Sequence, residues 1–268
     1  MRGLVTFLAT LIAILGIVVA VPTVWGERHI VDTDGFAASA SKAAHDREVQ
    51  DFFAEQISTQ IAQASGVSAA GTAAKPLAQS YTRSPAFAAD FAEVARQQHD
   101  WLFTEPAPGQ KTDTMDLNIT PMVNRVLQGS PIPVKVNQAV TIEMDQSDLT
   151  AGQLKQPGDI VRIAAWVSVI AAIGGAVVAL LFGRRRGAVL AWLGIGGIIG
   201  GAVGWFIAWY GERLVVSSES PEPLPAQRTI QLVTHDILSS LTSVSVITAV
   251  AGVAAVIIGV IAGVATRR

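Results

Sequence analysis

Four long stretches of almost purely apolar residues interrupt an otherwise polar chain of 268 residues. They cover residues 4–24, 160–183, 187–209 and 244–266. A helix needs roughly 20 apolar residues to cross a hydrocarbon core of about 30 Å, so each stretch is long enough to be a transmembrane helix. None holds an acidic residue, and the one charged side chain, Arg162, lies near the start of the second stretch. The pattern therefore predicts a membrane protein with four spans.

Acidic residues are confined to one side of these spans. The predicted short connections and ends on the other side carry six arginines and no acidic residue: Arg2, Arg184, Arg185, Arg186, Arg267 and Arg268. Because cytoplasmic segments are enriched in Lys and Arg, both termini are predicted to be cytoplasmic. The alternative is a signal peptide cleaved after Ala20. An apolar core of about 18 residues exceeds the roughly 7–15 of such signals and favours a retained anchor.

The predicted segments follow directly from these boundaries. They are transmembrane helix 1 (1–24), an extracytoplasmic domain (25–159), helix 2 (160–183), a cytoplasmic turn (184–186), helix 3 (187–209), an extracytoplasmic loop with an amphipathic helix (210–243), helix 4 (244–266) and a cytoplasmic tail (267–268). The extracytoplasmic domain has 10 basic and 17 acidic residues, which argues against binding to nucleic acid or, by charge, to anionic lipid surfaces. The chain has no cysteine, which excludes disulfides and thiolate chemistry.

Apolar spacing predicts a mainly helical extracytoplasmic domain. One helix is expected from Val49 to Ile61, after acidic residues at 46–48 that suit a helix N-terminus. Ser84 and Pro85 are a typical N-cap and first helical residue, and they predict a second long helix. Residues 62–74, rich in Gly, Ser and Ala, predict a loop between the two helices.

The end of this domain predicts shorter elements. Residues 115–119 and 139–144 alternate or are β-branched, which predicts a small two-stranded β element. Pro121 is expected to open a short helix that reaches Leu127.

The chain also carries a faint internal repeat. Residues 25–28, Trp-Gly-Glu-Arg, follow the first span, and residues 210–213, Tyr-Gly-Glu-Arg, follow the third. Residues 47–50 then resemble residues 228–231. One interpretation is a duplicated unit of outward span, turn, outer amphipathic helix and return span. The other is chance, because aromatic residues and arginines are common at membrane interfaces.

Residues 30–36 read Ile-Val-Asp-Thr-Asp-Gly-Phe, Val49 and Gln50 begin the next predicted helix, and His99 lies in the helix after it. With one span before this domain and three after it, the chain resembles a large family of actinobacterial four-span membrane proteins without an established activity. A Pro-Leu pair usual in that family is replaced here at residues 42–44. The resemblance implies the same topology and an actinobacterial cell envelope, and it implies no chemistry.

Motifs of familiar catalytic sites do not occur in the sequence, whether a Gly-x-Ser-x-Gly elbow, a Walker loop or a His-Glu-x-x-His helix. His45, His99 and His235 each precede an aspartate, and together they would suit a divalent metal if folding gathered them. Adjacent helix residues point in different directions, so no His-Asp pair chelates as a unit. We expect solvated surface histidines and predict no catalytic residue, metal site or cofactor.

Small residues recur at every fourth position in the last two spans. The stripes are Gly196, Gly200 and Gly204 in one span, and Ala251, Ala255, Gly259 and Gly263 in the other. This spacing lets helix backbones approach closely in lipid, so the stripes are candidate helix-packing surfaces. They pack either the chain's own spans or the spans of another protein. The short turn at 184–186, which forces an antiparallel hairpin, favours the first.

The helix of the outer loop offers a candidate interaction surface. Ile230, Val233, Ile237 and Leu241 fall on one helical face. An apolar stripe in water needs a partner surface, and the helix from Val49 to Ile61 is the expected one.

The residues that the spans lack disfavour some classes of function. No Asp, Glu, His or Lys lies inside the spans, which disfavours transport by this chain alone. We therefore predict a structural or accessory subunit in the lipid bilayer, whose extracytoplasmic domain binds another membrane or envelope protein and no nucleic acid. The alternatives are a component of a transport system and, less favoured, an extracytoplasmic membrane-bound enzyme.

Overall fold

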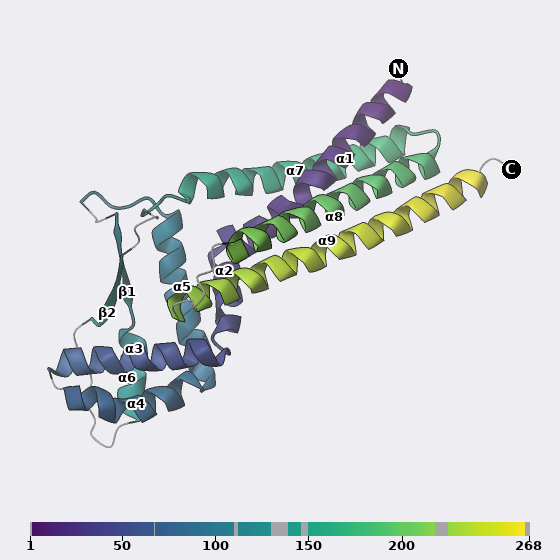
Figure 1. Cartoon of the computed structure of the whole chain (residues 1–268). Helices are drawn as coiled ribbons and strands as arrows, with labels where there is room; N and C mark the ends of the chain where they lie inside the picture. Colours follow the sequence, from purple (N-terminus) through teal and green to yellow (C-terminus); the bar gives the residue numbers. More distant parts are fainter. Residues whose placement is uncertain are drawn as a thin grey trace. The chain divides into compact units, whose positions relative to one another are not determined.

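The computed structural model describes residues 2–66, 68–109, 112–129, 139–145, 150–217 and 225–265, without the side chains of residues 68, 143–145, 215–217 and 225–232. The described part is mainly helical with one two-stranded sheet, as predicted (Figure 1). The chain divides into two compact units. Unit 1 comprises Met1–Val31, Pro157–Ser218 and Ile237–Arg268, and unit 2 comprises Asp32–Gln156 and Glu219–Asp236.

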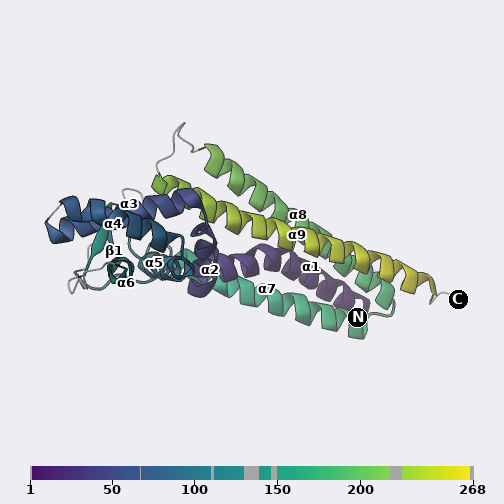
Figure 2. The ribbon, with the colours of Figure 1, turned by 90° about the horizontal axis from the view of Figure 1, so that it is seen from below.

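Unit 1 is built on four long helices: α1 (Arg2–Gly26), α7 (Lys155–Phe182), α8 (Arg186–Ser217) and the greater part of α9 (Pro225–Ala265). A short π-helix, η1 (Glu27–Val31), extends α1. Each of the four contains a segment long and apolar enough to cross a membrane, which agrees with the four predicted spans. Figure 2 shows α1 beside α7 and α8 beside α9. Large apolar side chains such as Phe7, Ile170 and Ile247 are exposed along these helices, as a lipid-facing surface requires.

Helices α8 and α9 pack through small residues spaced seven apart. A Cβ added at Gly194 would lie 2.5 Å from the carbonyl oxygen of Gly252, and one at Gly252 would lie 2.6 Å from the carbonyl oxygen of Gly194. The same contact recurs seven residues away in both directions, between Gly187 and Gly259 and between Gly201 and Ser245. The antiparallel backbones are therefore too close for any larger side chain, and such close packing drives helix association in lipid.

Helices α1 and α7 pack in the same way. A Cβ at Gly16 would lie 2.8 Å from the carbonyl oxygen of Ser168, and one at Gly175 would lie 2.7 Å from the carbonyl oxygen of Ala9. The hydroxyl oxygens of Ser168 and Thr23 lie 3.4 Å apart and add a polar contact. We call these two interfaces the α1/α7 seam and the α8/α9 seam.

The two seams are equivalent position by position. An offset of 185 residues relates α1 to α8, and an offset of 77 relates α7 to α9. With these offsets, the contact of Gly16 with Ser168 corresponds to that of Gly201 with Ser245. The contact of Gly175 with Ala9 corresponds to that of Gly252 with Gly194. The contact of Gly26 with Val161 corresponds to that of Gly211 with Leu238. The offset of 185 is the one that separates the two aromatic-Gly-Glu-Arg turns. These contacts favour duplication over chance for the spans.

The outer part of the proposed repeat does not follow this equivalence. Residues 47–50 begin α3 (Arg47–Ser65), a separate helix of unit 2. Residues 228–231 lie inside α9, which runs without a break from Pro225 into the fourth span. The outer helix and the return span therefore form one continuous helix in the second half, whereas α4, α5, α6 and the two strands separate α3 from α7 in the first half.

Besides the first part of α9, the described residues of unit 2 form five complete helices and two paired strands. They are α2 (Thr33–Ala43), α3, α4 (Ser68–Thr82), α5 (Pro85–Phe103), β1 (Thr114–Asn118), α6 (Thr120–Gln128) and β2 (Thr141–Asp145). The strands are antiparallel, with Leu117 opposite Ile142. One apolar core joins α3, α5 and α6 and includes the fully buried side chains of Ile57, Phe87 and Val123.

Most predictions for unit 2 are confirmed. Asp46 caps α3 by accepting hydrogen bonds from the backbone N–H groups of Glu48 and Val49, and Pro85 is the first residue of α5. The two strands lie within two residues of the predicted positions, and α6 contains the predicted short helix.

The loop predicted at residues 62–74 is wrong. These residues hold the end of α3 and the start of α4. Alanine has the highest helix propensity, and Ala74 is buried in the core, which outweighs the cost of glycine in a helix. Gly71 has a packing role, because a Cβ there would lie 2.8 Å from the carbonyl oxygen of Ser58 in α3.

Candidate functional site

Residues 32–36 of the motif fold onto His99 within unit 2. Asp32 caps α2 by accepting a hydrogen bond of 2.8 Å from the backbone N–H of Gly35. The hydroxyl oxygen of Thr33 lies 3.2 Å from Nδ1 of His99, and the ring of Phe36 lies 5.5 Å from the imidazole, centroid to centroid. Asp32 therefore begins α2 directly after the first span, and Thr33 and Phe36 hold α2 against α5.

His99 is buried, which makes the prediction of a solvated side chain wrong for this residue. Its exposed fraction is 3%, and the ring of Phe103 stacks on it at 4.3 Å. Nδ1 also lies 3.8 Å from Oδ1 of Asp100. The sequence did hold the signal, because Phe91, Ala95 and His99 recur at every fourth residue and the first two are core residues.

The other two histidines that precede an aspartate are exposed, as expected: His45 precedes the N-cap of α3, and His235 lies in α9. The Asp236 carboxylate next to His235 pairs with the Lys42 ammonium at 2.9 Å. Among the described residues, no group of three or more His, Cys, Asp or Glu side chains is arranged to hold a metal ion. The structure thus does not bring the three His-Asp pairs together there.

A second polar cluster joins three helices of unit 2. The Asp90 carboxylate in α5 accepts a hydrogen bond of 2.7 Å from the Tyr81 hydroxyl in α4. It also accepts two from the Arg125 guanidinium in α6, at 2.7 and 3.0 Å. Burial, and next the bond to Asp90, raises the pKa of Tyr81, and the bond to Asp90 raises the pKa of Arg125. Because both carboxylate oxygens are engaged, Asp90 ties the helices together and is a poor general base.

The predicted glycine stripe of the third span faces α1. A Cβ at Gly196 would lie 3.2 Å from Cγ1 of Ile14, and one at Gly200 would lie 3.3 Å from the carbonyl oxygen of Ile17. Gly204 lies between Cγ1 of Val21 and the Ser245 hydroxyl. These contacts are all within the chain.

The stripe of the fourth span divides between two surroundings. Gly259 is buried on α8, and the backbone of Gly263 lies against Gly187. Ala255 is half-buried and Ala251 is exposed, and the position that lies against α8 is Gly252. A spacing of four residues captured part of this surface, whereas the contacts themselves repeat every seven.

The stripe predicted for the outer loop is shared between the units. The side chain of Ile230 lies outside the described residues. Val233 packs against the core of unit 2, while Ile237 and Leu241 belong to unit 1 and are buried. The side chains of Ile237 and Leu241 are therefore not available as an exposed interaction surface.

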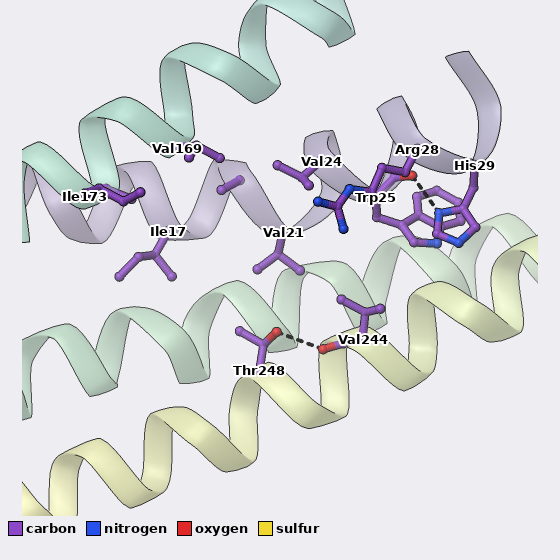
Figure 3. A pocket seen from close by; sticks show the side chains of 12 residues that line it. Ile17, Val21, Val24, Trp25, Arg28, His29, Val169, Ile173, Val244 and Thr248 are labelled. Atoms are coloured by element: carbon purple, nitrogen blue, oxygen red, sulfur yellow. Dashed lines mark hydrogen bonds between the residues drawn. The ribbon is translucent and has the colours of Figure 1, made fainter. Parts of the chain in front are cut away.

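A groove of about 370 Å³ lies in unit 1 between α1, α7 and α9 (Figure 3). Its walls are apolar and come from Ile17, Ala20, Val21 and Val24 in α1, from Val169, Ala172 and Ile173 in α7, and from Val244 in α9. The hydroxyl of Thr248, also in the wall, donates to the Val244 carbonyl at 2.8 Å. The wall therefore presents a surface suited to an apolar ligand.

One end of this groove is polar. The indole Nε1 of Trp25 donates to the Ser240 hydroxyl at 2.8 Å. His29 stacks on Trp25, with centroids 5.6 Å apart, and its Nδ1 donates to the Trp25 carbonyl at 3.0 Å. Arg28 and His29 lie in η1. Turns of π-helix are rare in proteins overall, and those that occur are often found at functional sites. An apolar groove with a cationic end was not predicted from the sequence.

No protein-family model matches the sequence, and none of the curated proteins or solved structures compared with it does.

Proposed function

We propose that this chain is an integral membrane protein of the cell envelope, with both termini cytoplasmic and unit 2 outside, that serves as a structural or accessory subunit. In this role unit 2 binds a membrane or envelope protein. The proposal is in line with the actinobacterial four-span family that residues 30–36 resemble.

The distribution of charge at the ends of unit 1 carries the topology. Gly183 lies near Thr6, and Gly187 lies against Gly263, so the start of α1, the α7–α8 turn and the end of α9 share one end. The charged residues described there are arginines: Arg2, Arg184, Arg185 and Arg186. This is the end that the positive-inside rule assigns to the cytoplasm.

The opposite end of unit 1 is mixed in charge. Glu27, Asp159 and Glu212 follow or precede the apolar segments there. The guanidinium of Arg162 pairs with Asp159 at 3.5 Å, which suits a position in the headgroup layer. Acidic residues thus accompany the ends of the spans that lead to unit 2, which favours an outer location for that unit.

The accessory role is supported by how unit 2 uses its polar residues. The contacts of Thr33 with His99, and of Asp90 with Tyr81 and Arg125, all join helices. A helical unit whose helices are tied together in this way, carried on a membrane anchor, suits the binding of a partner.

Single cysteines test the topology, since the chain has none of its own. Ala64 near the end of α3 and Arg185 in the α7–α8 turn are both exposed. In intact cells, Ala64→Cys should react with an impermeant maleimide, and Arg185→Cys should react only after permeabilisation. Gly187 is unsuitable for this purpose, because its Cβ would lie 2.5 Å from the Gly259 carbonyl oxygen. The reverse labelling pattern would contradict the orientation.

Site-specific photo-crosslinking tests the accessory role. A photoreactive amino acid at exposed positions of unit 2, such as Ala64, should give a discrete adduct with another protein in native membranes. The same residue at Arg185 is the matched control on the predicted cytoplasmic side. Adducts restricted to the chain itself at every exposed position of unit 2 would overturn the proposal. If the crosslinked partner is itself a transporter or channel, the chain is a component of a transport system.

A further inference from the structure

We propose that the groove of unit 1 binds one acyl chain of an anionic phospholipid, with the lipid phosphate on Arg28. The inference rests on the membrane location proposed above and goes beyond the accessory role. Along α1 the groove extends from Ile17 to Arg28. At 1.5 Å per residue this is about 16 Å, close to half of a hydrocarbon core of about 30 Å. The groove therefore matches the chain of a lipid in a single leaflet.

Arg28 is placed to receive the headgroup. It is exposed, and within the described part of the chain no side-chain hydrogen bond or ion pair engages its guanidinium. Figure 3 shows the side chain extending from η1 back toward Val24, beside Trp25 and His29. A planar guanidinium binds phosphate oxygens in a bidentate manner, and indole rings favour the headgroup layer. The apolar wall and the cationic end thus match the two parts of one lipid molecule.

The internal duplication shows what the same position holds in the other half. The offset of 185 relates Ala20 to Trp205, Val24 to Trp209 and Arg28 to Arg213. There the guanidinium of Arg213 lies 4.1 Å from the centroid of the Trp209 ring, and Trp205 stacks beside Trp209 at 6.4 Å. In the second half the arginine contacts the protein's own aromatic ring. In the first half, alanine and valine leave that space open, and the lipid occupies it.

The attraction must be local, because the segments on the outer side are acidic overall. Residues 25–159 hold 17 acidic and 10 basic residues, so this face as a whole does not attract anionic lipid. One guanidinium at the end of a groove of the right length selects a bound lipid without a basic surface.

Native mass spectrometry of the full chain in nanodiscs tests the proposal. The probe is phosphatidylglycerol mixed one to three with phosphatidylcholine. The wild-type protein should retain one phosphatidylglycerol per chain in preference to phosphatidylcholine. Arg28→Gln should weaken retention roughly fivefold, the effect of about 1 kcal/mol per basic residue near a lipid headgroup. Val24→Trp, which copies the second half, should abolish retention, and the matched control Arg213→Gln should leave it unchanged.

Three outcomes would overturn the inference. They are equal retention of both lipids by the wild type, unchanged retention in Arg28→Gln and Val24→Trp, and an equal loss in Arg213→Gln. The thermal midpoint of each variant verifies folding, and Arg28→Gln alters only an exposed side chain, so it remains informative if Val24→Trp unfolds. Correct cysteine labelling without a retained lipid would reject the lipid site alone. Failure of the labelling pattern would reject the membrane topology itself.

Discussion

Gly174 and Gly175 are neighbours in α7 with opposite surroundings: a Cβ at Gly175 would lie 2.7 Å from the Ala9 carbonyl oxygen, whereas one at Gly174 would meet no atom within 4 Å. Only Gly175 belongs to the α1/α7 seam. The pair therefore separates the effect of packing from the effect of glycine in a helix.

We predict that Gly175→Val destabilises unit 1 and that Gly174→Val does not. The added side chain must push two backbones apart, and overpacking of this kind costs about 1–3 kcal/mol. The matched Gly174→Val variant should change the free energy of unfolding by within about 0.5 kcal/mol. Unfolding by heat or by titration with a denaturing detergent measures both. Equal losses in the two variants would mean that the seam does not support the fold.

The internal duplication predicts the same result in the other half. Gly252 is the equivalent of Gly175 and lies against Gly194, while its neighbour Ala251 is exposed. Gly252→Val should therefore cost about as much as Gly175→Val, roughly 1–3 kcal/mol, and Ala251→Val should cost little. The same unfolding titration provides the comparison. A loss of unfolding free energy in Ala251→Val and none in Gly252→Val would show instead that the packing surface follows the four-residue spacing predicted from the sequence.

Burial of His99 leads to a prediction for unit 2. Replacing the imidazole by alanine removes its stacking on Phe103 and its contact with the Thr33 hydroxyl. His99→Ala should lower the free energy of unfolding by about 2–3 kcal/mol, in the range of large-to-small core changes. His45→Ala, at an exposed position, is the control and should stay within about 0.5 kcal/mol. Trp101, in the same unit, offers a fluorescence signal for the titration. A neutral His99→Ala variant would contradict the anchoring role.

Sequence alone was sufficient where the determining signal is local. Apolar length predicted the four membrane-spanning helices, because crossing a bilayer depends on composition over about 20 consecutive residues. The acidic residues before Val49 and the Ser84-Pro85 pair placed the starts of α3 and α5, because such signals act within one helical turn. The Ser84 side chain itself makes no capping hydrogen bond.

Sequence was insufficient where distant segments meet. The Asp90 carboxylate contacts Tyr81 and Arg125, which are 9 and 35 residues away, and no local pattern links them. The seam between Gly194 and Gly252 was equally hidden, because its spacing becomes visible only when both helices are aligned. The groove at Arg28 is lined by residues of three helices, so no single span predicts it.

Loss of the Asp90 ion pair should weaken unit 2 more than loss of an exposed pair. Asp90→Asn keeps the shape of the side chain and removes the charge that faces Arg125, whose side chain is 47% exposed. Solvent screening limits the expected loss to about 1–2 kcal/mol. Asp51→Asn, which breaks the exposed pair with Arg83, is the control and should cost no more than about 0.5 kcal/mol. Chemical unfolding of both variants measures the difference, and equal costs would show that burial adds nothing.

The raised pKa of Tyr81 makes the stability of unit 2 depend on alkaline pH. Burial, followed by the bond to Asp90, keeps the phenol protonated in the fold, whereas an unfolded tyrosine ionises at about pH 10. The folded pKa is the higher one, so this contribution is complete below about pH 10 and is lost as the pH rises above it. Between pH 9 and pH 11 the wild type should lose about 1.4 kcal/mol more than Tyr81→Phe. Other groups titrate in both proteins and cancel in this difference. Identical pH profiles of stability for the two proteins would contradict the raised pKa. So would a higher tyrosinate absorbance in the folded wild type than in folded Tyr81→Phe at pH 11, because it would show that the Tyr81 phenol ionises in the fold.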